Sequence, residues 1–395
     1  MGILALIAVA GLLGPLLSMS RRLMIPIVAG EILGGVALGP SLLNLVHANS
    51  ALVQLLHAAG FSVVMFTIGM HLPLRDVTLR RESCRAVLMV LATFAVGAGL
   101  GLLIGHFTDF GHPFVVSLLL ANSSAALAVP VVRNDTATPD TATTRLIAWV
   151  MLADIAAVLL VPLATSSHPL LRVVGGTVLV VVAAVVFFLI QRQMISRGLW
   201  QRLHELSIER GWGWSLRINL ALLFSLTWLA TVSFTSALIA GFACGAVAAA
   251  LGVTDHLVTE VIGVGEGFFI PVFFVTLGVS LDPRTLLESS TVDFAAVVVA
   301  GNIVVHAVGA LVGRVGVARG LVASAQLGVP ASIVTIGTSS HWMSASSASA
   351  IMASSMASIA LCSLGSFQLG HSFRVHDRGM LHRVHQRPED RTGEN

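Results

Sequence analysis

Long apolar stretches recur along the whole sequence, separated by short segments that carry nearly all of the charged residues. A run of roughly 20 apolar residues forms a helix that crosses the hydrocarbon core of a bilayer. The pattern therefore predicts an all-α polytopic membrane protein embedded in the lipid bilayer. We expect about 13 transmembrane helices, at approximately residues 2–19, 23–39, 51–70, 86–108, 114–132, 146–166, 171–190, 216–235, 237–252, 261–281, 294–313, 320–338 and 346–366.

The composition agrees with this class and excludes several others. Of the 395 residues, 56% are hydrophobic and only 10% are charged, whereas soluble domains carry about 25% charged residues. The sequence has no phosphate loop, nucleophile elbow or metal-binding cluster, so it predicts no enzyme and no cofactor. The basic pI near 9.3 reflects topology, and no nucleic-acid partner is expected.

The arginines predict the orientation in the membrane. All 22 basic residues are Arg, and 20 of them, including Arg145, fall in connections on one side or in the C-terminal tail, leaving Arg172 and Arg284 for the other side. Because cytoplasmic connections are enriched in basic residues, we expect a multi-pass protein of the cell membrane with an outer N-terminus and a cytoplasmic C-terminus.

Three regions follow from this arrangement. Residues 1–368 form the transmembrane domain, residues 191–214 form a cytoplasmic linker with an amphipathic, interfacial pattern, and residues 369–395 form a short polar cytoplasmic tail. The tail leaves no room for a folded regulatory domain. Any gating is therefore expected in the bundle, in the linker or in a separate regulatory subunit.

Two of the predicted spans are interrupted by small and polar residues. The span 114–132 contains Asn122-Ser123-Ser124 and Pro130, and the span 320–338 contains Gln326, Gly328, Pro330 and Ser332. Interrupted segments in corresponding positions of two halves are typical of transporters with inverted repeats and a binding site near the bilayer midplane. A kink relieved by serine hydroxyls would also explain either segment alone.

Asp154 lies in the middle of the apolar span 146–166. A carboxylate at the centre of a membrane helix is unfavourable, and such residues usually mark ion pathways or proton relays. Asp154 is therefore the first candidate for a binding residue.

Four strings resemble the monovalent cation:proton antiporter superfamily, specifically its Kef-type branch of sodium/hydrogen exchanger-like membrane domains. They run from Pro26 to Pro40, Val63 to Leu74, Thr235 to Ala246 and Gly267 to Leu281. The resemblance implies inverted repeats, two broken helices that cross beside the carboxylate, a panel domain that dimerises as a homodimer, and a mobile core domain.

The resemblance also places individual residues. Asp154 falls on the family's ion-binding aspartate, and His306 stands where relatives often carry a basic residue. Ala153 replaces an Asp, Asn or Gln that is common in relatives, and the Arg and Glu frequent in the span 320–338 are absent. The polar centre is thereby reduced to one carboxylate and one histidine.

These residues suggest a chemistry of exchange. Asp154 with Asn122, Ser123 and Ser124 can supply oxygen ligands to Na⁺ or K⁺, and the carboxylate can bind a proton instead. One carboxylate predicts one-for-one, electroneutral exchange by alternating access. His306 is a candidate proton carrier or core polar partner.

Other polar residues are open to two interpretations. Asn302 and Ser332 are further candidate polar partners in the core, and Glu31 and Glu266 either line the inner funnel or hold local structure. His57 is interpreted as a residue at a span end or as a packing residue.

Two functions of different class remain open: a secondary transporter, or a membrane protein that kept the fold as a non-transporting sensor or subunit. An organic-solute carrier on the same fold is a third alternative.

Overall fold

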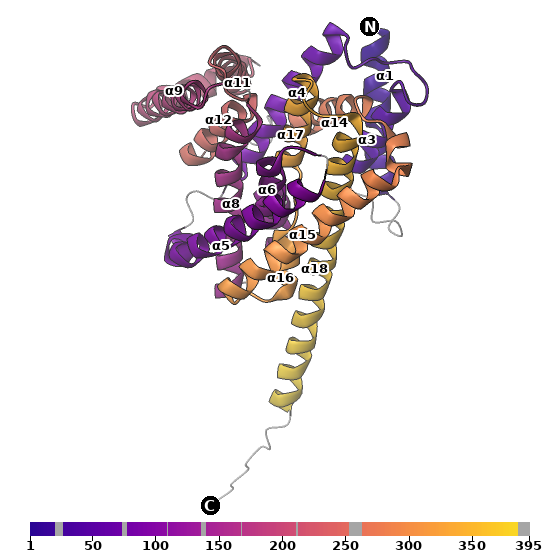
Figure 1. Ribbon diagram of the computed structural model, residues 1–395. Coiled ribbons are helices and arrows are strands. Elements are labelled where there is room, and N and C mark those ends of the chain that lie inside the picture. Colours follow the sequence, from indigo (N-terminus) through magenta and orange to yellow (C-terminus); the bar gives the residue numbers. More distant parts are fainter. Residues whose placement is uncertain are drawn as a thin grey trace, which may run out of the picture.

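A computed structural model describes residues 1–19, 27–72, 77–108, 110–135, 140–166, 168–210, 212–252 and 263–385, and every regular element in this part of the chain is a helix (Figure 1). In it, eight helical stretches are long and apolar enough to cross a membrane, and five shorter apolar helices accompany them. Taken in chain order, these stretches correspond to the thirteen predicted spans. The predicted fold class is confirmed.

The elements follow one another along the chain with short connections. Their bounds are α1 Gly2–Gly11, α2 Leu13–Ser18, α3 Ile27–Leu38, α4 Ala51–Met70, α5 Val77–Phe107, α6 Pro113–Ala121, α7 Ala125–Asp135, α8 Thr141–Thr165, α9 Leu170–Ser196, α10 Leu199–Arg210, α11 Trp214–Val232, α12 Ala237–Leu251, the π-helix η1 Gly265–Phe269, α14 Ile270–Val279, the 3₁₀-helix η2 Pro283–Leu287, α15 Ser289–Gly313, α16 Val317–Ala323, α17 Gly328–Ser339 and α18 Ala345–His385.

The helices pack into two groups. The panel group consists of α1 to α4, α9, α11, α12 and η1 with α14, and the core group consists of α5 to α8 and α15 to α18. In Figure 1, α1, α3 and α14 lie together on one side of the bundle, and α5, α15 and α16 lie together on another. The polar residues singled out in the sequence divide between these two groups.

Glycines allow the panel helices to approach closely. A Cβ at Gly245 of α12 would overlap the carbonyl oxygen of Phe66 in α4, and one at Gly35 of α3 would overlap the carbonyl oxygen of Val275 in α14. Without a strong hydrophobic drive between helices in lipid, such small residues favour association through close backbone packing.

Two spans are broken, as the sequence predicts. The first break, residues 122–124, separates α6 from α7, and the second break, residues 324–327, separates α16 from α17. The prolines do not cause these breaks, because Pro130 lies inside α7 and Pro330 lies in the first turn of α17. A proline in a first turn removes no helical hydrogen bond.

Several predicted boundaries differ from the observed ones. α5 begins at Val77 and α8 at Thr141, so both helices include residues that the sequence assigns to connections. The predicted linker 191–214 contains the end of α9 and the helix α10. α18 continues past the predicted tail boundary to His385 and extends beyond the bundle in Figure 1; residues 386–395 lie outside the described part of the chain.

Arg145 is not the connection residue that the sequence predicts. It lies buried in α8, where its Nε donates to Glu82 of α5 at 2.8 Å and its guanidinium also donates to the carbonyl oxygen of Gly313 at the end of α15. A charged residue such as Arg145 can therefore lie inside the first turns of a helix, because its partners on neighbouring helices satisfy its charge and its hydrogen bonds.

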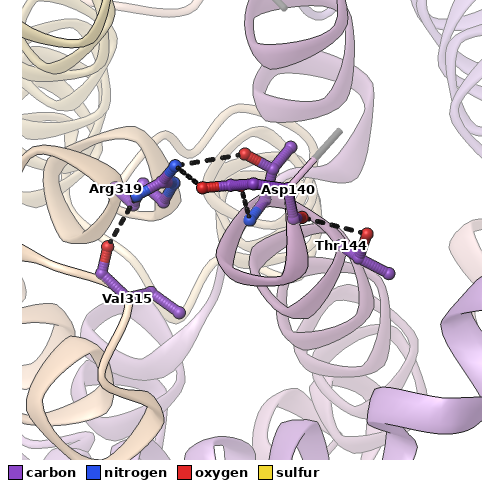
Figure 2. A network of polar contacts seen from close by, with 5 residues as sticks. Asp140, Thr144, Val315 and Arg319 are labelled. Atoms are coloured by element: carbon purple, nitrogen blue, oxygen red, sulfur yellow. Dashed lines mark hydrogen bonds and ion pairs between the residues drawn. The ribbon is translucent and has the colours of Figure 1, made fainter. Parts of the chain in front are cut away.

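Asp140 joins the start of α8 to α16 at the same edge of the core group (Figure 2). One carboxylate oxygen accepts from the backbone N–H of Thr143 at 2.7 Å, and the other accepts from Arg319 at 2.7 Å. Partial burial alone would raise the pKa of the Asp140 carboxyl, but the hydrogen bonds with Thr143 and the Arg319 charge outweigh it and lower the pKa. The two ion pairs join α5, α8 and α16 at one end of the core group, and the hydrogen bond from Arg145 to Gly313 adds α15.

Candidate functional site

Asp154 of α8 lies at the N-terminus of α7. Its side chain is 3% exposed, and its Oδ2 accepts a hydrogen bond from the backbone N–H of Ala125, the first residue of α7, at 3.0 Å. A helix N-terminus carries free N–H groups and a positive partial charge. The break in the helix therefore creates a favourable environment for this carboxylate inside an apolar bundle.

The two breaks touch each other beside Asp154. The backbone N–H of Ser124 in the first break donates to the carbonyl oxygen of Ala325 in the second at 2.7 Å. This bond satisfies two backbone groups that a continuous helix would have paired internally. A main-chain hydrogen bond thus joins the two broken helices where they cross.

His306 of α15 is bonded to the first break. Its Nδ1 lies 2.9 Å from the carbonyl oxygen of Asn302, and its Nε2 lies 3.0 Å from Ser123 Oγ. A carbonyl oxygen only accepts, so Nδ1 carries the proton, and in the neutral ring Nε2 accepts from the Ser123 hydroxyl. The structure therefore joins two predicted site residues, Ser123 and His306, in one buried contact.

Four more side chains around the crossing carry buried atoms without hydrogen-bond partners. Both the oxygen and the nitrogen of the Asn122 amide are unpaired, and so are Ser124 Oγ, Asn302 Oδ1 and Gln326 Nε2. Buried polar groups are normally paired, and an unpaired one in a native fold calls for an explanation, of which a bound water or ion is one. Three of these atoms are neutral oxygens, the ligand type that hard monovalent cations prefer.

Some contributors were not identified from the sequence. The Trp149 ring packs against His306 at 5.6 Å between centroids. In the second break, the Gln326 N–H donates to Ser358 Oγ at 3.1 Å, and its carbonyl accepts from Ser355 Oγ at 2.7 Å. The only sequence signal for the serines is their density in the last apolar span.

Other predicted site residues lie elsewhere. Ser332 Oγ donates back to Gly328 in its own helix and approaches Met65 Sδ at 3.8 Å, so it faces α4 rather than Asp154. Glu31 is buried in α3 against Gly14 of α2, and Glu266 is exposed on η1. Asn302, in contrast, lies at the crossing, where its amide donates to the Ser324 carbonyl at 3.2 Å.

Comparison with known proteins identifies the family and the fold of this chain. The family model described as sodium/hydrogen exchanger, transmembrane, matches residues 5–368. The solved structure of the sodium proton antiporter MjNhaP1 from Methanocaldococcus jannaschii superposes with a TM-score of 0.59 at 17% identity, covering 92% of this chain and 96% of that chain. The likeness to MjNhaP1 shows the fold.

Curated relatives are more similar in sequence. The putative Na⁺/H⁺ antiporter YjbQ of Bacillus subtilis is 23% identical over 73% of this chain and 49% of its own length. The Na⁺/H⁺-K⁺ antiporter GerN of Bacillus cereus is 26% identical over 67% of each chain. This chain therefore spans about half of YjbQ and two thirds of GerN.

These relatives are transporters rather than enzymes. The match over nearly the whole chain, together with the crossed broken helices, shows that the protein belongs to the sodium/hydrogen exchanger family of membrane antiporters.

Proposed function

We propose that the protein is a secondary active transporter that exchanges a monovalent cation, Na⁺ or K⁺, for H⁺ by alternating access. The observation that carries this proposal is the position of the Asp154 carboxylate at the α7 N-terminus, beside buried oxygens that have no partner. The names of the relatives support it, since they include antiporters for sodium and for potassium.

The site residues would contribute to cation binding in different ways. Asp154 supplies the negative charge, and the unpaired Asn122 Oδ1, Ser124 Oγ and Asn302 Oδ1 are the neutral oxygens available to a dehydrated cation. The Ser123 hydroxyl already donates to His306, so it contributes at most its lone pairs. The single negative charge of Asp154 balances the charge of one monovalent cation bound there, so no second charged side chain is needed.

Competition at one carboxylate produces exchange. Asp154 binds either a cation or a proton, and each neutralises the charge that would otherwise resist passage through the apolar interior. If the core group moves only when Asp154 is neutralised, each movement carries one cation or one proton. The expected exchange is one for one and electroneutral.

A membrane-potential experiment tests the stoichiometry. In proteoliposomes without K⁺, a membrane potential can be imposed by the diffusion of a lipophilic ion. This potential should leave the rate of cation–proton exchange unchanged. A rate that follows the potential would show that a second titrating group, for which His306 is the candidate, carries an additional proton.

The arginine distribution supports an arrangement in the cell membrane with the N-terminus outside and the C-terminus in the cytoplasm. The panel group is the surface through which we propose a homodimer to form. The proposed orientation and the proposed homodimer do not depend on the proposed exchange at Asp154.

The proposed function is tested by an antiport assay in everted vesicles with a pH-sensitive dye. The wild type should exchange protons for Na⁺, K⁺ or Li⁺, and Asp154→Asn should fall to the level of vesicles without the protein. Asp293→Asn is the matched control, because Asp293 is an exposed carboxylate at the start of α15.

Two outcomes would favour the alternatives. Absence of exchange with every cation would favour a non-transporting sensor or subunit, or a carrier of organic solutes. Equal exchange by the wild type and Asp154→Asn would remove Asp154 from the mechanism.

A further inference from the structure

His57 of α4 bridges three helices. Its Nδ1 lies 3.0 Å from Thr276 Oγ1 of α14, and its Nε2 lies 3.1 Å from Thr335 Oγ1 of α17. The ring also packs against Phe273 of α14 at 5.0 Å between centroids. Both ring nitrogens are therefore engaged, which exceeds what a packing position requires.

The hydrogen-bond network determines where the ring carries its proton. Thr276 has one hydroxyl hydrogen, and it is directed at the carbonyl oxygens of Val272 and Phe273 at 2.8 and 2.9 Å. Thr276 Oγ1 must then accept from His57 Nδ1–H. In the neutral ring, Nε2 is left as an acceptor for the hydroxyl of Thr335.

The two bonds of His57 differ in what they join. α4 and α14 both belong to the panel group, so the bond to Thr276 fixes the ring within that group. Thr335 belongs to the core group, so the second bond crosses between the groups. Two further contacts of α17 with α4 involve apolar atoms or sulfur: Gly328 lies against Ile68, and Ser332 Oγ lies 3.8 Å from Met65 Sδ.

The bridge lies at one side of the membrane-spanning bundle. His57 is near the start of α4, whereas Thr276 and Thr335 are near the ends of α14 and α17. All three ends lie on the side to which the sequence assigns Arg172 and Arg284, which is the arginine-poor side. The bond from His57 to Thr335 joins the two groups at that side.

Thr335 is also connected to the ion site. It lies seven positions after Gly328, the first residue of α17, and two helical turns span roughly 10 Å. The second break directly precedes α17, and its Ala325 carbonyl accepts from Ser124 beside Asp154. A rigid helix therefore links the bridge to the crossing.

We propose that His57 is a positioning residue for transport, and that its bond to Thr335 latches the core group to the panel group at the arginine-poor side. The inference rests on the proposed function. Alternating access moves one bundle against the other around a fixed site, so the latch must break when the arginine-poor side opens and re-form when it closes. The bond from His57 to Thr276 stays within the panel group and keeps the ring in place.

The latch predicts an asymmetry between the two faces of the transporter. The apparent KM at one face varies inversely with the population of the state open to that face. Loss of one neutral hydrogen bond shifts an equilibrium by roughly 2- to 10-fold. His57→Ala and Thr335→Val should each change the ratio of the KM values at the two faces by that factor.

The measurement compares Na⁺-dependent exchange in everted and right-side-out vesicles. The double variant His57→Ala/Thr335→Val should change the ratio no more than either single variant, because both remove the same bond. Thr338→Val is the matched control: its hydroxyl lies in α17 and donates to Val334 of its own helix at 2.7 Å. It should leave the ratio unchanged.

Hydrogen–deuterium exchange of the purified protein gives a readout that does not require transport. Both single variants and the double variant should increase exchange over residues 330–339 equally, and Thr338→Val should not. Additive effects, or single variants that match Thr338→Val in both measurements, would overturn the latch. If the wild type transports no cation, the proposed function fails. The hydrogen–deuterium exchange of residues 330–339 then decides by itself whether His57 couples the two groups.

Discussion

The two breaks meet through one main-chain hydrogen bond but have different side-chain environments. In the first break, the Asn122 amide and Ser124 Oγ are buried without partners. In the second, Ser324 Oγ donates to Leu321, and the main chain of Gln326 is bonded on both sides by serines of α18. The first break therefore holds three unpaired buried side-chain atoms, whereas the second holds one, Gln326 Nε2.

The difference indicates a division of roles between two repeats of similar geometry. Unsatisfied buried groups reduce stability, so they persist where function requires them. The first break provides the helix N-terminus and the free oxygens beside Asp154, and the second provides a rigid surface against which the first is held.

The largest predicted effect is in the first break. Asn122→Leu removes two unpaired polar atoms with little change in volume. We expect a roughly 10- to 100-fold loss in apparent cation affinity, by analogy with the loss of a hydrogen bond to a charged group. The free energy of unfolding should stay the same or increase. Dye-based exchange and thermal unfolding in detergent measure the two quantities.

If Asn122→Leu lost stability and affinity together, the amide would be a structural residue and the contrast between the breaks would disappear.

His306→Ala affects the connection between α15 and the first break. It leaves the Ser123 hydroxyl unpaired and opens a cavity beside Trp149. The expected loss in the free energy of unfolding is roughly 2–4 kcal/mol. Tryptophan fluorescence during thermal unfolding reports the change, and His106→Ala, at an exposed position of α5, serves as the control. An unchanged midpoint would contradict the role of His306 in holding the first break.

Substitutions that affect the second break should lower the stability of the protein and leave its cation affinity unchanged, the opposite of what we expect for the first break. Ser355→Ala and Ser358→Ala each leave a buried main-chain group of Gln326 unpaired, at a cost of about 1–3 kcal/mol. The cation KM should change little in the protein that remains folded. Ser363→Ala is the control, because Ser363 donates only to its own helix at Ile359. A large rise in KM without loss of stability would place the second break in the ion site.

The smallest effect is expected at Asp140, outside both breaks. Asp140→Ala removes the cap of α8 and the pair with Arg319, whereas Asn at this position keeps a capping side chain. The free energy of unfolding of Asp140→Ala should be about 1 kcal/mol lower than that of Asp140→Asn, because only Asn still caps α8. The exposed ion pair, with 48% of the Asp140 side chain accessible, adds less than about 1 kcal/mol.

The pH dependence of this pair follows from the direction of its pKa shift. Because the pKa of Asp140 is lowered in the fold, its contribution is complete above the unfolded pKa of about 3.9. It is lost as the pH falls through the folded pKa. The stability difference between wild type and Asp140→Asn should therefore vanish in acid, and a difference that grew in acid would contradict the assignment.

The sequence predicts the parts of this site that depend on local signals. Asp154 stands out because a carboxylate in an apolar span is unusual, and the first break because three small polar residues interrupt a helix. Pro130 and Pro330 looked like breakers but lie within helices, since a proline is accommodated where its missing N–H is not needed or is compensated.

Contacts between distant helices are not visible in such patterns. The pairing of Ser123 with His306, the support of Gln326 by α18 and the bridge made by His57 all depend on which helix faces approach one another. Apolar periodicity is weak in spans that are hydrophobic on every side, so it does not specify those faces. The same limit explains why Ser332, Glu31 and Glu266 were candidates although they lie away from Asp154.

The central claim is that a cation and a proton compete for Asp154. The most direct test measures the apparent KM for the transported cation in proteoliposomes over a range of pH, with Asp154→Asn as the inactive reference. Competition by one proton predicts a KM that rises up to tenfold for each unit by which the pH is lowered, with the maximal rate at saturating cation unchanged. A KM independent of pH, with a maximal rate that falls in acid, would contradict the account.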